Sequence, residues 1–88
     1  MIHNKEDAIR IIYRHVKERS LRFNCNIYDI GIQIQLYKSI LNIHGRTITL
    51  LNRIGWVYIT DQRGMGYSTP SIVHIAPKGV DFVERNEK

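Results

Sequence analysis

Two runs of aromatic and β-branched residues limit the folds open to this chain more than any other feature. Residues 56–60 read Trp-Val-Tyr-Ile-Thr and residues 71–75 read Ser-Ile-Val-His-Ile, compositions typical of β-strands. The segment between them, residues 61–70, contains two glycines and a proline and favours a loop. Two strands joined by such a loop form a hairpin. The sequence therefore predicts a hairpin, and 88 residues leave room for one small domain around it.

The segment before the hairpin, residues 45–54, has the two-sided pattern of an amphipathic helix. At about 100° per residue, its apolar side chains together with Thr47 cover one continuous arc, and its other polar residues cover the rest. Gly55 follows, where a helix commonly ends on a left-handed residue. Asn42 and Gly45 favour a turn just before the helix. The sequence thus predicts a turn, a helix over 45–54 and a direct step into the hairpin.

An N-terminal helix is predicted over residues 4–20, with Asn4 as its cap. One apolar stripe at helical spacing marks its buried side: Ile9, Ile12, Tyr13 and Val16. The opposite side carries Arg10, Arg14 and Lys17, which we interpret as a solvated face. Residues 21–27 alternate apolar and polar side chains, which predicts a short extended segment.

Residues 28–41 fit two patterns. Their isoleucines alternate with glycine and glutamine from position 30 to 36, which favours a strand. Ile30, Ile34, Tyr37 and Leu41 also keep helical spacing. We interpret the segment as a helix because a turn and a second helix follow it, although Gly31 inside a helix costs about 1 kcal/mol relative to alanine.

The C-terminal part of the chain predicts one more short helix. Pro77 suits the first turn of a helix, and Val80 with Phe82 or Val83 then points inward. Residues 84–88 are wholly polar and are predicted to fray.

This order of elements resembles the winged helix-turn-helix family. The resemblance rests on three segments: the turn and helix start at 41–48, the step Leu51…Gly55-Trp56-Val57, and residues 73–82 with their Lys-Gly pair. It implies an α+β fold in a single domain, residues 1–88, with three helices, a two- or three-stranded wing sheet and a short C-terminal helix. Ala76 departs from the family pattern, because a capping threonine is common there.

The resemblance implies binding of duplex DNA, with helix 45–54 in the major groove and wing 61–70 on the backbone or in the minor groove. Arginine reads guanine and asparagine reads adenine by paired hydrogen bonds. The net charge is +5, and residues 38–64 hold four cations against the single acid Asp61. The residues expected to contact DNA are Lys38, His44, Arg46, Thr49, Asn52, Arg53, Gln62 and Arg63.

A small transcriptional regulator acting as a homodimer is the function predicted first, since palindromic sites need two recognition helices. Ile11, outside the buried stripe of the first helix, is a candidate dimer contact. The second reading is a winged-helix module that docks to a protein of the replication or transcription machinery without reading DNA. Binding of structured RNA is a third.

Other chemistry finds little support in the residues. The histidines and Cys25 do not have metal-ligand spacing, and nothing indicates a small-molecule cofactor. A chain this short lacks the elements that build a catalytic cleft, so an enzyme is not expected. The single cysteine excludes an intrachain disulfide and favours a reducing compartment, the cytoplasm. No apolar run is long enough for a signal peptide or a transmembrane helix, so no membrane partner is expected.

Overall fold

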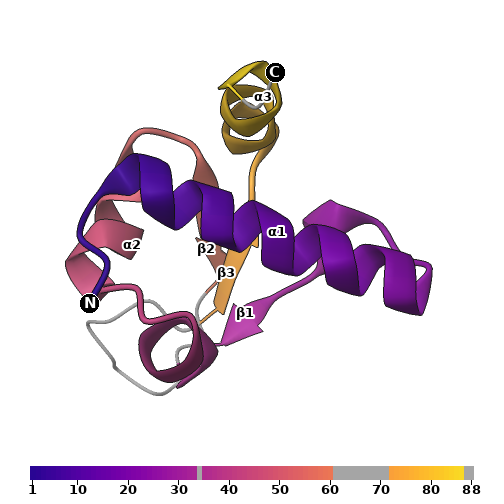
Figure 1. Cartoon of the computed structure of the whole chain (residues 1–88), viewed down its shortest axis with the longest axis horizontal. Helices are drawn as coiled ribbons and strands as arrows, with labels where there is room; N and C mark the ends of the chain where they lie inside the picture. The colour runs from indigo at the N-terminus through magenta and orange to yellow at the C-terminus, as the bar shows by residue number, and fades with distance from the viewer. Residues whose placement is uncertain (34, 61–71, 87–88) are drawn as a thin grey trace.

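The two strands predicted for the hairpin belong to the sheet of an α+β structure, and the loop predicted between them at 61–70 lies outside the described residues. The computed structural model describes residues 1–33, 35–60 and 72–86, and in these ranges it contains three α-helices and a three-stranded antiparallel sheet (Figure 1). Strand β2 (Val57–Thr60) pairs with β3 (Ile72–Ile75), and Val57 lies opposite Ile75. The short strand β1 (Ile32–Gln33) pairs with the other edge of β3. The two predicted strands of the hairpin are therefore confirmed.

Helix α1 (Lys5–Phe23) begins as predicted, because the Asn4 side chain accepts a hydrogen bond from the Asp7 amide at 3.0 Å. It continues past the predicted end and stops at Asn24, a left-handed residue with φ 52°. The extended segment predicted for 21–27 is thus wrong for its first three residues. Leu21 and Phe23 belong to an alternating apolar and polar pattern in the sequence, but they lie on the last turn of a helix and both are exposed.

The helix predicted over 28–41 is also wrong. The chain instead forms a 3₁₀ turn, η1 (Ile27–Asp29), then β1, then one π-helical turn, η2 (Leu36–Ile40). The alternation of isoleucines in this region reflects the strand. A β-carbon on Gly31 would lie 2.8 Å from Cγ2 of Ile72, so the glycine permits a close approach to the sheet.

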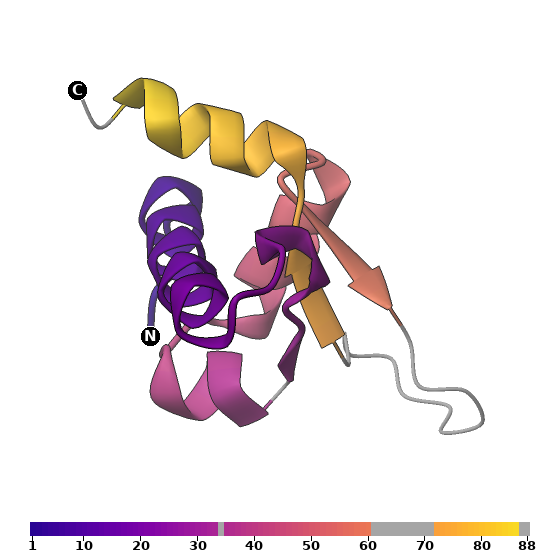
Figure 2. The ribbon, with the colours of Figure 1, turned by 90° about the vertical axis from the view of Figure 1, so that its right-hand side faces the viewer.

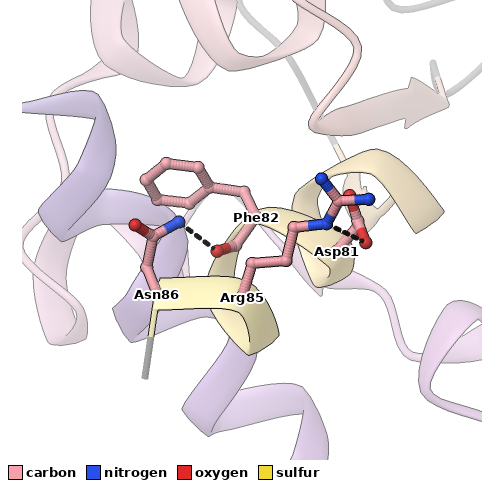
Figure 3. Close-up of polar contacts among 4 residues, drawn as sticks. All are labelled: Asp81, Phe82, Arg85 and Asn86. Atoms are coloured by element: carbon pink, nitrogen blue, oxygen red, sulfur yellow. Dashed lines mark hydrogen bonds and ion pairs between the residues drawn. The ribbon is translucent and has the colours of Figure 1, made fainter. Parts of the chain in front are cut away.

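Helix α2 (Gly45–Arg53) and helix α3 (Pro77–Asn86) match the predicted starts. Gly55 has φ 82°, in keeping with its predicted role after α2. The fraying predicted for the polar tail is wrong for 84–86. Arg85 pairs with Asp81 at 3.1 Å, and the Asn86 amide donates to the Phe82 carbonyl at 2.7 Å (Figure 3). Glu84 accepts a hydrogen bond from the Tyr13 hydroxyl on α1.

Helix α1 crosses the molecule and packs against α2, α3 and β3 (Figures 1 and 2). The four residues of its predicted buried stripe are all buried. Gly79 on α3 has no room for a side chain, because a β-carbon there would collide with the Trp56 carbonyl. The Lys-Gly pair of the resemblance thus has a packing reason. The core also contains Ile30, Ile32, Tyr37, Ile43, Ile48, Leu51, Val57, Val73, Ile75, Val80 and Val83.

None of the helices in the described ranges is both long enough and apolar enough to cross a membrane.

Candidate nucleic-acid interface

Helix α2 separates a buried face from an exposed polar face. Ile48 and Leu51 are fully buried, and Thr47 is buried with them. The four side chains predicted to contact a groove are all exposed: Arg46, Thr49, Asn52 and Arg53. The structure therefore brings together, on one side of one helix, the residues that the sequence pattern had grouped.

The arginines of this face are not neutralised by neighbours. The ion pairs among the described residues are Arg10–Asp7, Arg22–Glu18 and Arg85–Asp81, and none involves α2. Residues 30–60 contain no aspartate or glutamate at all. Arg46 and Arg53 therefore leave their guanidinium groups available to an anion or to a base edge.

Thr49 uses its hydroxyl donor within α2. Its hydroxyl donates a hydrogen bond to the Gly45 carbonyl at 3.2 Å, one turn back along α2. Because the donor is used inside the helix, Thr49 retains its methyl group and the lone pairs of its oxygen for a partner. That arrangement suits contact with a thymine methyl better than donation to a phosphate.

His44 caps α2. Its Nδ1 accepts a hydrogen bond from the Arg46 amide at 3.1 Å, and its ring lies 4.8 Å from the ring of His3. An accepting Nδ1 carries no proton, so the Nε2 of a neutral His44 is the donor that remains. The sequence did not predict this contact of His3, since no spacing rule joins positions 3 and 44.

The N-terminal segment holds the start of α2 in place. Ile2 forms a parallel bridge with Ile43: its amide donates to the Asn42 carbonyl at 2.7 Å, and its carbonyl accepts from the His44 amide at 3.1 Å. The Thr47 hydroxyl donates to the same Ile2 carbonyl at 3.3 Å. This bridge brings His3 to the exposed side of the turn before α2.

Lys38 also reaches the start of α2. Its Cε lies 3.4 Å, and its Nζ 3.8 Å, from the place where a β-carbon on Gly45 would stand. The ammonium group thus lies beside the first turn of α2, where the helix dipole also favours an anion. Lys38, from η2, therefore brings a positive charge to the turn of α2 that carries Arg46.

One backbone carbonyl from the first half of the chain contacts both strands of the hairpin. The Tyr28 carbonyl accepts a hydrogen bond from the Tyr58 hydroxyl at 2.8 Å and one from Nδ1 of His74 at 3.1 Å. The rings of Tyr58 and His74 stack, with centroids 4.8 Å apart. Since a carbonyl only accepts, Nδ1 of His74 holds the proton. Gln62 and Arg63, predicted to contact DNA, lie outside the described residues.

Two titratable groups outside this face have a pKa that burial shifts from its ordinary value. Burial raises the pKa of the Tyr37 hydroxyl in the core. It lowers the pKa of His15 on α1, and the positive charge of Arg19 lowers it further. No cluster of three or more histidine, cysteine or acidic side chains suited to a metal occurs in the part of the chain that the structure describes.

Comparisons with protein-family models, with curated proteins and with solved structures give no significant match.

Proposed function

We propose that this chain is a winged helix-turn-helix protein that binds duplex DNA in a sequence-specific manner. One observation supports the proposal most: α2 buries one face in the core and exposes Arg46, Asn52 and Arg53 on the other, with no acid nearby in sequence. A helix held in this way matches the size and donor pattern of the major groove. The turn η2 then serves as a shortened first helix of the helix-turn-helix.

The exposed side chains divide into two roles in this proposal. Arg46, Asn52 and Arg53 read base edges. Lys38 and His44, at the start of α2, contact phosphate and set the position of the helix. Residues 61–70 lie against the backbone or in the minor groove, as the resemblance implies. A protein of this kind acts most simply as a transcriptional regulator.

The decisive experiment selects bound sequences from random duplex DNA and then measures affinity by fluorescence anisotropy. Arg46→Ala and Arg53→Ala are each expected to weaken binding about 5- to 150-fold, the loss of one base contact. Arg85→Ala removes an equal charge from α3 and serves as the matched control. Circular dichroism confirms that each variant is folded. Unchanged affinity in both α2 variants overturns the assignment of α2.

The same measurements separate the alternatives. Absence of binding to any duplex at low salt, together with a protein partner that survives nuclease treatment, favours the interaction module. Efficient competition by structured RNA, but not by duplex DNA, favours RNA binding.

A further inference from the structure

The outward side of α1 carries a second ordered pattern. We define the α1 outer face as Ile11, Arg14, Glu18 and Leu21. Their spacing of three, four and three residues is that of the contact positions in a coiled coil. Arg14 and Glu18 are exposed, Leu21 is 78% exposed, and Ile11 is half-buried. This face points away from the core, and the last turns of α1 extend beyond the other helices (Figure 1).

A hollow lies beside the first half of this face. It measures about 180 Å³ and is lined by Ile11, Arg14, His15 and Glu18 of α1 and by Leu41, which follows η2. Ile40, the neighbour of Leu41, is 72% exposed. The lining combines the apolar side chains of Ile11 and Leu41 with charged ones, so the hollow offers contacts to an apolar side chain brought in by a charged helix.

The charges of the face are incompletely paired within one chain. Arg14 makes no ion pair or side-chain hydrogen bond with any other residue that the structure describes. Glu18 pairs at 3.2 Å with Arg22, but its side chain remains 67% exposed. A carboxylate accepts several hydrogen bonds, so Glu18 retains capacity for a second cation.

The order of these residues is complementary to itself in one orientation. Positions 11 and 21, and positions 14 and 18, are symmetric about Val16. When two copies of α1 meet antiparallel and cross at the level of residue 16, whose own side chain is buried in the core, Ile11 faces Leu21 of the second copy and Arg14 faces its Glu18. Both contacts then occur twice, as two-fold symmetry requires. A parallel pairing instead places each charge against its own copy, which is repulsive.

We propose that the α1 outer face binds a second copy of this chain in this antiparallel orientation, with Leu21 of each copy entering the hollow beside Ile11 and Leu41 of the other. The pairing rests on the geometry of α1 and not on DNA binding. Four side chains per copy form a surface smaller than a standard interface of about 1,600 Å². The dimer is therefore expected to dissociate on dilution.

Sedimentation equilibrium without DNA, from about 1 to about 300 μM protein, tests the proposal. Wild type is expected to change from monomer to dimer across this range. Arg14→Glu and Glu18→Arg each place two like-charged pairs in the interface and are expected to raise the Kd at least tenfold. Leu21→Gln, at an exposed position that leaves the monomer intact, is expected to do the same.

Mixing supplies the sharpest control. Arg14→Glu makes the face wholly acidic and Glu18→Arg makes it wholly basic, so an equimolar mixture is expected to dimerise although neither variant does so alone. The double variant, with both charges exchanged, is expected to regain wild-type affinity. Lys78→Glu, an equal charge reversal on α3, is expected to leave the dimer unchanged. A wild type that stays monomeric, or an Arg14→Glu variant that dimerises like wild type, overturns the proposal.

Discussion

Helices α1 and α2 have the same plan and differ in how they order charge on the exposed side. Each buries one apolar face in the shared core. The exposed face of α2 carries positive charges and uncharged polar groups but no negative charge. The α1 outer face instead carries, in chain order, an apolar, a basic, an acidic and an apolar side chain. A face of one sign repels its own copy and attracts a polyanion, but an alternating face can meet its own copy. The order of charges, rather than amphipathicity, thus distinguishes the partners we propose for the two helices.

The largest expected effect is on the free energy of unfolding, because loss of the shared core would disrupt both helices. Leu51→Ala removes a fully buried side chain from α2 and is expected to cost about 2–5 kcal/mol of unfolding free energy. Leu21→Ala, on the exposed side of α1, is expected to change it by less than about 0.5 kcal/mol. Urea titration monitored by circular dichroism gives both values. Equal losses at the two leucines would contradict the burial described for them.

Charge reversals on the two faces are expected to separate the two activities. Arg53→Glu removes a base contact and adds repulsion, so DNA affinity is expected to fall about 100-fold. The Kd of the dimer is expected to stay unchanged, because Arg53 belongs neither to the α1 outer face nor to the residues that line the hollow beside it. Arg14→Glu is expected to weaken the dimer and to leave the contacts of each monomer with a single half-site intact. Anisotropy with a half-site duplex and sedimentation report the two quantities. Loss of both activities in either variant would deny that the faces act separately.

Salt sharpens the comparison further. Lys38, the cation assigned to phosphate in each copy, gives an expected contribution near −0.9 to the slope of log affinity against log salt, or about a 3.5-fold loss between about 50 and 200 mM. The dimer, with its few exposed ion pairs, is expected to weaken less over the same range. Titrations of each equilibrium at four salt concentrations measure both slopes. A Lys38→Ala variant with the same DNA slope as wild type would exclude phosphate contact by Lys38.

The smallest expected effect concerns pH. Burial lowers the pKa of His15, which lines the hollow beside the α1 outer face. The folded chain therefore binds this proton less readily than the unfolded chain, whose His15 titrates near pH 6.5. Stability is expected to be fully present above about pH 6.5 and to decline as the pH falls below it. The decline levels off once the folded state is protonated as well. His15→Gln is expected to reduce this decline, as measured by urea midpoints at several pH values; identical pH profiles would assign the decline to other groups.

Local patterns predicted most of the fold correctly. The hairpin, the bounds of α2 to within one residue and the buried stripe of α1 follow from short-range periodicity and from the positions of glycine and proline. The exposed polar face of α2 followed from the same periodicity, which is why the four residues on it were identified together.

The errors arise where distant residues decide the structure. Ile30 to Gln33 became extended because β3, some forty residues later, offers an edge for pairing, and helical spacing in the same segment concealed this. Residues 84–86 stay helical partly because Tyr13 donates a hydrogen bond to Glu84. His3 joined His44 through a backbone bridge at Ile2. None of these contacts has a signature in the residues near it.

That bridge at Ile2 has a practical consequence for measurement. Because the backbone at the amino end is hydrogen-bonded to the turn before α2, a fluorophore joined ahead of Met1 sits beside that turn, while one attached at Asn86 lies at the end of α3 (Figure 1). The first dye is placed to sense a ligand arriving at α2, and the second is placed as its reference. Two singly labelled proteins therefore allow binding at α2 to be followed by fluorescence, with the dye on α3 as the reference.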